Sequence, residues 1–279
     1  MQGNNPQTEV LRVDVRKVFS DKNPRMARLL PGFIYRYIER IVWQDWINNF
    51  LEHNRGKTGL DFIHAIFDEF NTKINIKGEE NIPRKGRYIF ASNHPLGGFD
   101  GVILIDAVSR YLGESKFLVN DILMNLRPMD DLFVPINKHG SQSKDNALMI
   151  EELFRSDVQI LTFPSGMVSR KIKGVITDLQ WKKNFISKAI QYQRDVVPVY
   201  FSGKNSNFFY NLSNIRTFLG IKWNLEMFYL VDESMKHRNS EITVAFGPPV
   251  QWTTFDKSKT HQEWADFVRE KVYSLPDYY

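Results

Sequence analysis

The chain has 279 residues, of which 42% are hydrophobic and 14% aromatic, so it can bury a sizeable core and is not a disordered chain. It contains no cysteine, which excludes a disulfide framework, a cysteine nucleophile and a cysteine-based zinc site. The formal charge of +5 favours anionic partners such as phospholipid headgroups, acidic carrier proteins or nucleic acid. Because it has no apolar run of about 18 residues and its first residues are polar, we expect a soluble or peripheral protein.

The first 59 residues predict an N-terminal helical region. Residues 1–24 are a mostly polar lead-in, and from Pro24 to His53 large apolar side chains recur at the spacing of an amphipathic helix. The apolar positions are Ile34, Ile38, Ile41, Val42, Trp46 and Phe50, and the accompanying arginines are Arg25, Arg28, Arg36 and Arg40. Such a helix is typical of an interfacial membrane anchor, but also of a helix packed on a domain. The residues alone leave both interpretations open.

Residues 60–279 predict a single α/β unit in which strands and helices alternate. Strands are expected at residues 73–77, 87–91, 116–119, 132–136, 158–163, 196–201 and 241–247. Helices are expected at residues 60–70, 121–126, 144–154, 181–192 and 262–272, and another begins at residue 102. This order is typical of a mostly parallel central sheet flanked by helices on both faces.

The most informative stretch is residues 92–101, Ser-Asn-His-Pro-Leu-Gly-Gly-Phe-Asp-Gly, which join a buried strand to a helix. This loop carries one imidazole, His94, and one carboxylate, Asp100, at the kind of strand–helix junction where α/β proteins place their sites. A neutral imidazole that is oriented by a carboxylate can take a proton from a hydroxyl. The alternative is a structural loop in which Asp100 caps the following helix.

Two further segments follow strands at the same edge of the predicted sheet. Residues 135–140 bring Lys138 there, either as an anion-binding cation or as part of an ordinary basic turn. Residues 162–170, Thr-Phe-Pro-Ser-Gly-Met-Val-Ser-Arg, form a tight turn or part of a site. The cations close to this segment are Arg170, Lys171, Lys173, Lys182 and Lys183. They form either a solvated face or a landing site for an anionic headgroup, CoA phosphates or an acyl carrier protein.

In this order the segments resemble the motif blocks of the glycerolipid and lysophospholipid acyltransferase superfamily, over roughly residues 60–250. His94 and Asp100 resemble its Asn-His-x4-Asp block, although five residues rather than four separate them, so the bend at residues 97–98 must absorb one residue. Lys138 stands where the superfamily has a phosphate-binding arginine. In the superfamily's Phe-Pro-Glu-Gly-Thr-Arg-Ser block, the matching residues are Phe163, Pro164, Gly166 and Ser169, and the departures are Ser165 and Val168.

The segment that ends at Arg170 is similar to the Phe-Pro-x-Gly-x-Val-Ser-Arg form of one branch, which contains haemolysin-like proteins and O-acyltransferases of ornithine- and glycine-lipid synthesis. The resemblance implies an acyltransferase-like fold with His94 as base and Asp100 as its orienting carboxylate. It also implies substrate contacts from Lys138, Phe163, Pro164, Ser165, Gly166, Ser169 and Arg170. Neither a cofactor nor a metal is expected.

The expected reaction moves a fatty acyl chain from acyl-ACP or acyl-CoA to the hydroxyl of a lysolipid. Because Ser165 and Val168 replace a glutamate and an arginine of the superfamily, we expect a lyso-aminolipid or a lysophospholipid rather than glycerol 3-phosphate as acceptor. The expected location is peripheral, on the cytoplasmic face of the inner membrane. The rival interpretation is a non-catalytic, haemolysin-like membrane-binding protein that acts through its N-terminal helix.

Other enzyme classes find no support in the sequence. It has no Gly-x-Ser-x-Gly elbow of a serine hydrolase and neither of the glycine-rich motifs of dinucleotide and P-loop enzymes. The histidines, His53, His64, His94, His139, His237 and His261, lack metal-ligand spacing.

Overall fold

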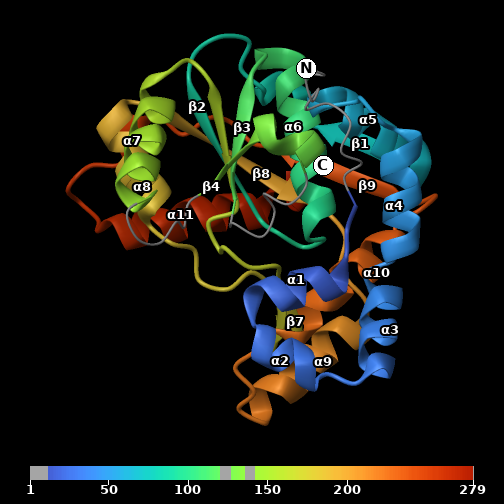
Figure 1. Cartoon of the computed structure of the whole chain (residues 1–279). Helices are drawn as coiled ribbons and strands as arrows, with labels where there is room; N and C mark the ends of the chain where they lie inside the picture. The colour runs from blue at the N-terminus through green and yellow to red at the C-terminus, as the bar shows by residue number, and fades with distance from the viewer. Residues whose placement is uncertain (1–11, 120–126, 136–141, 279) are drawn as a thin grey trace.

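A seven-stranded sheet forms the centre of the protein (Figure 1). The structure is a computed structural model that describes residues 12–119, 127–135 and 142–278. The strand order is β1-β9-β8-β2-β5-β3-β4. The strands are β1 (Lys73–Lys77), β2 (Tyr88–Ser92), β3 (Ser115–Val119), β4 (Phe133–Pro135), β5 (Gln159–Thr162), β8 (Asp195–Phe201) and β9 (Glu241–Phe246).

Five neighbouring strands, from β8 through β2, β5 and β3 to β4, are parallel. β9 pairs with β8 in the antiparallel sense, and β1 is parallel to β9. The mostly parallel sheet predicted from the alternating strands and helices is therefore confirmed. Parallel strands bring their carboxyl ends to one edge, so the chain leaves β2, β5 and β8 on the same side.

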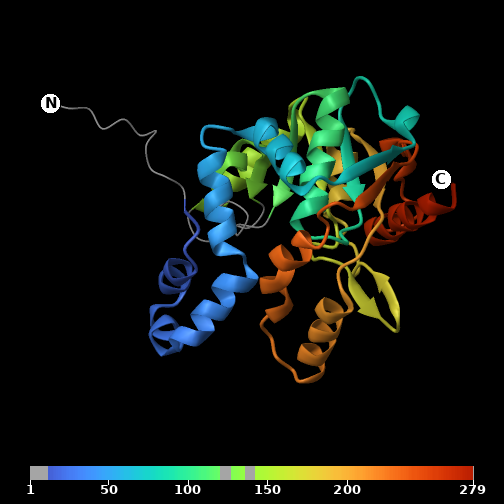
Figure 2. The ribbon, with the colours of Figure 1, turned by 90° about the vertical axis from the view of Figure 1, so that its right-hand side faces the viewer.

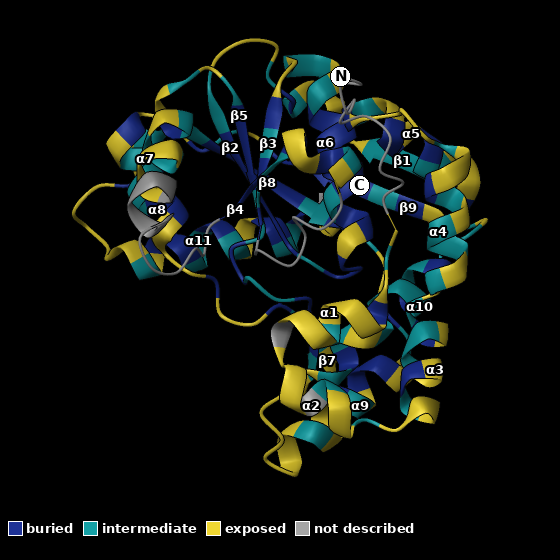
Figure 3. Ribbon diagram, in the orientation of Figure 1, coloured by how far each residue is buried: buried dark blue, intermediate teal, exposed yellow. Residues whose placement is uncertain are grey.

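Helices cover both faces of the sheet, as the sequence predicts. The helices of the larger unit are α5 (Gly59–Phe70), α6 (Gly98–Leu112), α7 (Gln142–Arg155), α8 (Asn184–Tyr192) and α11 (His261–Ser274). Successive residues of β2 enter different cores: Phe90 packs with the residues of α5 and α6, and Ile89 packs with those of α8 and α11. The central strands β2, β5 and β8 are mostly buried, while the outer helix faces are exposed (Figure 3).

The prediction of one helix between Pro24 and His53 is wrong. The N-terminal region contains α1 (Val15–Lys22), α2 (Pro24–Leu29), α3 (Gly32–Ile41) and α4 (Gln44–His53). Pro31 separates α2 from α3, and Trp43 lies between α3 and α4 with a left-handed φ of 52°. Of the two interpretations of this region, packing holds for α4, whose Leu51 joins the core of α5 and α6. The division of the chain at residue 59 stays a prediction.

Two elements at the carboxyl edge of the sheet are not among the strands and helices that the sequence predicts. One is a hairpin of β6 (Arg170–Ile172) and β7 (Val175–Thr177). The other is the β8–β9 connection, residues 202–240, which carries α9 (Asn207–Phe218), a 3₁₀ turn, η4 (Leu225–Tyr229), and α10 (Leu230–Met235). Both lie with α1, α2 and α3 at one end of the molecule, as the two perpendicular views show (Figures 1 and 2).

The helix expected at residues 121–126 lies outside the described residues. Within the part of the chain that the structure describes, no helix is both long and apolar enough to cross a membrane.

Candidate active site

The loop that leaves β2 is fixed to the neighbouring strand β8 by the side chain of Asn93. Its Nδ2 donates to the Phe201 carbonyl over 3.0 Å, and its Oδ1 accepts from the Phe201 N–H over 2.7 Å. This pair of bonds replaces the ladder where the two strands diverge. The next residue, His94, is thereby held at the carboxyl edge of the sheet.

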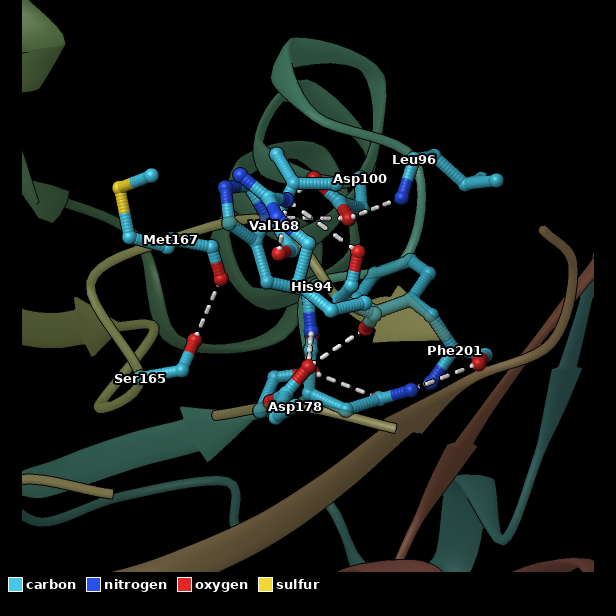
Figure 4. A network of polar contacts seen from close by, with 12 residues as sticks. His94, Leu96, Asp100, Ser165, Met167, Val168, Asp178 and Phe201 are labelled. Atoms are coloured by element: carbon cyan, nitrogen blue, oxygen red, sulfur yellow. Dashed lines mark hydrogen bonds and ion pairs between the residues drawn. The ribbon is translucent and has the colours of Figure 1, made fainter. Parts of the chain in front are cut away.

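His94 and Asp100 are in contact (Figure 4). Nδ1 of His94 lies 3.0 and 3.1 Å from the two carboxylate oxygens, and the Leu96 N–H donates to Oδ2 of Asp100 over 2.9 Å. Asp100 stands in the first turn of α6, whose N-cap is Gly97 with φ 82° and ψ −131°. This left-handed bend absorbs the extra residue between the two side chains. Asp100 does not provide the side-chain cap that the structural alternative required, since its carboxylate faces His94.

The environment selects the tautomer of His94. A buried carboxylate against Nδ1 favours a proton on that nitrogen, which leaves Nε2 as the acceptor. No described residue forms a hydrogen bond with Nε2, and the side chain of His94 is 16% exposed, so part of it is open to solvent. The arrangement suits a general base with its orienting carboxylate.

Phe163 fixes the plane of the imidazole. The two rings stack with centroids 3.9 Å apart and an interplanar angle of 17°. Phe163 in turn packs on Phe117 of β3 at 4.8 Å. Stacking and the Asp100 contact together hold the ring of His94 in one orientation.

A second carboxylate, Asp178, supports the loop from behind, and the sequence analysis did not identify it. Its Oδ1 accepts from the His94 N–H over 3.2 Å and from Oγ of Ser169 over 2.5 Å, while its Oδ2 accepts from Nε1 of Trp181 over 2.9 Å. Burial raises the pKa of Asp178, and the hydrogen bonds from Ser169 and Trp181 oppose that rise. Asp178 lies nine residues after Ser169 and 84 residues after His94, outside the recognised blocks, and carries no spacing signal of its own.

Ser169, a predicted substrate contact, is therefore engaged inside the protein. Its backbone N–H also donates to the His94 carbonyl over 2.8 Å. Ser165 is buried too, and its hydroxyl donates to the Met167 carbonyl over 2.8 Å. Both serines shape the two loops in this structure, and their contact with substrate stays a prediction.

Arg170, expected as a free cation for an anionic headgroup, is not free. Its guanidinium is buried and donates to Glu226 over 3.0 Å and to the Val168 carbonyl over 2.6 Å. A different cation, Lys182, lies beside the turn: a Cβ placed on Gly166 would come within 3.1 Å of its Nζ. Lys138 lies outside the described residues.

An apolar pocket of about 320 Å³ adjoins Phe163. Its lining comes from the sheet, from α7 and α8, and from the turn that contains Pro164 and Gly166, with Lys182 and Lys188 also in its wall. Lys188 is paired with Glu151 over 2.6 Å. The pocket therefore offers an apolar surface next to Phe163, on which the imidazole stacks. It also offers the ammonium group of Lys182, which has no ion-pair partner among the described residues. A larger cavity, about 650 Å³, is lined by residues of β8 and α11, by Asn81 and by the segment that follows β9, and contains none of the predicted site residues.

Among the described residues no group of three or more histidine and acidic side chains is arranged to hold a metal ion.

Comparison with known proteins identifies the family. A family model described as acyltransferase matches residues 17–278. The lyso-glycine lipid O-acyltransferase of Bacteroides thetaiotaomicron is 51% identical over 264 residues, 94% of this chain and 97% of that protein. The enzyme of the same name from Phocaeicola vulgatus is 46% identical over 267 residues, 95% and 96% of the two chains. The crystal structure of the 1-acyl-sn-glycerophosphate acyltransferase of Thermotoga maritima has a TM-score of 0.46 at 16% identity, over 94% of this chain and 98% of that one. The chain thus belongs to the acyltransferase family and is an enzyme rather than the non-catalytic membrane-binding protein of the rival interpretation.

Proposed function

We propose that this enzyme transfers a fatty acyl group from a thioester to the hydroxyl of a lyso-glycine lipid, an acceptor with one acyl chain and one carboxylate. The observation that carries the proposal is the contact of Asp100 with Nδ1 of His94, which leaves Nε2 without a hydrogen-bond partner among the described residues. Phe163, which stacks on this imidazole, lines the apolar pocket. The names of the two relatives that align over more than nine-tenths of the chain support this acceptor.

The proposed reaction needs one base and no covalent enzyme intermediate. Nε2 of His94 takes the proton of the acceptor hydroxyl while the oxygen attacks the thioester carbonyl. Asp100 stabilises the imidazolium that forms. The tetrahedral intermediate collapses, the C–S bond breaks, and His94 returns the proton to the leaving thiolate. The donor is an acyl-ACP or an acyl-CoA, and the reaction takes place on the cytoplasmic face of the membrane where the lipid acceptor resides.

The charges around the turn support a carboxylate rather than a phosphate dianion. Ser165 replaces the superfamily's glutamate, and Arg170 is already paired with Glu226. Beside Gly166, Lys182 offers a point charge, which is enough for one carboxylate but lacks the bidentate geometry that favours phosphate.

The test is an acceptor comparison with purified enzyme. Each acceptor (lyso-glycine lipid, lyso-ornithine lipid, lysophosphatidic acid, glycerol 3-phosphate) is supplied with acyl-ACP and, separately, with acyl-CoA. We expect kcat/KM for lyso-glycine lipid to exceed that for glycerol 3-phosphate by about 100-fold, the effect of two missing charge-assisted contacts. Lys182→Met should raise KM for lyso-glycine lipid, whereas Lys183→Met serves as the matched control. A preference for glycerol 3-phosphate would contradict the proposed acceptor.

A further inference from the structure

The outer end of the β8–β9 connection exposes a dense group of apolar side chains. Phe218 at the end of α9 is 90% exposed, and Trp223 in the following loop is 62% exposed. Ile215 precedes them in α9, Leu219 and Ile221 lie between them, and all three are exposed as well. Single exposed apolar residues are common on proteins, but five within residues 215–223 form a patch that marks an interaction site. We call residues 215–223 the α9 tip.

A second exposed apolar group lies at the same end of the molecule. Leu29 of α2 is 82% exposed and Phe33 of α3 is 64% exposed. In both views, α2 and α3 lie at the end that also carries α9 (Figures 1 and 2). α3 also contacts η4, which follows the α9 tip in the chain: the hydroxyls of Tyr37 and Tyr229 lie 2.5 Å apart.

The α9 tip is held in place by a buried ion cluster. Arg216 donates through Nε and Nη2 to the carboxylate of Glu226, over 2.8 and 3.1 Å, and Arg170 binds the same carboxylate. Nη1 of Arg216 donates to the Ile221 carbonyl over 2.9 Å, which ties the loop to the helix. Glu226 is fully buried. A buried carboxylate that pairs with two arginines fixes one geometry, so the apolar tip is presented on a rigid base and does not fold back onto the core.

The charges of both segments complement an anionic surface. Residues 24–36 and 207–224 contain five arginines and lysines and no aspartate or glutamate. Four of these cations, Arg25, Arg28, Arg36 and Lys222, are exposed, and the fifth, Arg216, is paired with the buried Glu226. A face that combines exposed aromatic and aliphatic side chains with cations is typical of proteins that bind at the interface of an anionic bilayer. A second copy of the chain is a poor occupant, because a two-fold contact would bring these like charges together.

We propose that the α9 tip, together with Leu29 and Phe33, docks onto an anionic lipid bilayer. The proposal rests on the proposed function only in that a lipid acceptor resides in such a bilayer. The position of the tip fits this role, since the β8–β9 connection leaves the same edge of the sheet as the loop of His94. Leu230 of this connection also packs on that loop: it lies 3.1 Å from where a Cβ on Gly97 would be. Docking therefore places the site edge toward the membrane.

The first test measures binding without catalysis. The full-length protein is sedimented with phosphatidylglycerol vesicles and with phosphatidylcholine vesicles, at low and high salt. We expect binding to the anionic vesicles that weakens with salt, and a loss of at least about tenfold in affinity for a Phe218→Ser/Trp223→Ser variant, which removes two large apolar side chains. The matched control is Leu148→Ser/Met149→Ser, since these exposed apolar residues lie on α7, away from the tip. The control should bind like wild type.

The second test separates docking from chemistry. With an acceptor dispersed in detergent, the α9-tip variant should keep the wild-type rate, and with the acceptor embedded in vesicles it should lose at least about tenfold. If no form of the enzyme acylates any acceptor, the proposed function fails, while the sedimentation result still decides the docking proposal. Equal vesicle binding by the tip variant and wild type would overturn it. So would a wild-type dimer in lipid-free solution that the tip variant cannot form, because the tip would then bind a second copy.

Discussion

His94 is oriented by three independent contacts, each from a different element. Asp100 in α6 binds Nδ1, Phe163 after β5 stacks on the ring, and Asp178 accepts from the backbone N–H. Of the two ring nitrogens of His94, only Nε2 has no hydrogen-bond partner among the described residues. At the scale of the residue, the structure therefore prepares one nitrogen to accept a proton before any substrate is present.

Removing this nitrogen should abolish turnover. We expect His94→Ala to lower kcat by about 100- to 10,000-fold, the usual contribution of a general base. Asp100→Asn should lower kcat severely as well, because an amide that donates to Nδ1 places the proton on Nε2. Initial rates under saturating acceptor measure both effects, and thermal unfolding checks that the variants are folded. A His94→Ala enzyme that keeps more than about one-hundredth of the wild-type kcat would contradict the role of base.

At the scale of the element, the start of α6 determines whether His94 and Asp100 meet. Gly97 adopts a φ of 82°, and a Cβ there would lie 3.1 Å from Leu230, whereas a Cβ on Gly98 would meet no atom within 4 Å. The two adjacent glycines therefore differ in whether they tolerate a side chain. Gly97 makes the positive-φ bend, whereas Gly98 is only the first residue of α6.

This contrast gives a matched pair of variants. We expect Gly97→Ala to reduce the free energy of unfolding by about 1–3 kcal/mol, because the new side chain meets both a strained backbone and Leu230. Activity should fall with it, since the same bend positions Asp100. Gly98→Ala, in the first turn of α6, should leave stability within about 1 kcal/mol of wild type. Urea unfolding measures both, and equal effects of the two substitutions would show that the bend does not require Gly97.

The elements also show what the sequence can predict. Apolar runs such as residues 196–201 identify buried parallel strands, because a strand covered on both faces has no polar side. The pairing of His94 with Asp100 follows from the motif and its flexible bend. Two features do not follow: the left-handed conformation of Trp43, which a bulky residue rarely adopts, and the tip of α9, whose apolar residues face solvent. Periodicity assumes that apolar side chains point inward, so it fails where they serve an interface.

The site residues also divide into those that the motif identifies and those whose role only the fold shows. Phe163 and Gly166 stand in a recognisable block, but the roles of Ser169 and Arg170 depend on partners outside that block, nine and 56 residues further along the chain. Asp178 accepts the hydroxyl of Ser169, and Glu226 binds the guanidinium of Arg170. A motif shows which residue types recur, and only the fold shows which of them are already satisfied by a neighbour.

At the scale of the whole molecule, the β8–β9 connection links the site edge to the far side of the sheet. His237, between α10 and β9, stacks on Phe99 of α6 with centroids 6.5 Å apart, and its carbonyl accepts from the hydroxyl of Thr72, which precedes β1. Burial lowers the pKa of His237, although Glu233 and Asp100 counteract this effect. The folded protein therefore holds this histidine in its neutral form at a pH where the unfolded chain begins to protonate it.

The sign of the resulting pH dependence is determined by proton binding. As the pH falls below about 6.5, the unfolded chain binds the proton of His237 first, so the free energy of unfolding decreases until the pH reaches the lowered pKa of the folded state. The slope from this group is at most about 1.4 kcal/mol per pH unit. We expect His237→Gln to lose this component, so that its stability falls less than that of wild type between about pH 7 and pH 5. Urea unfolding of both proteins across this range isolates the contribution of His237, because all other titrating groups are common to the two. Parallel stability curves would show that the β8–β9 connection does not hold His237 neutral.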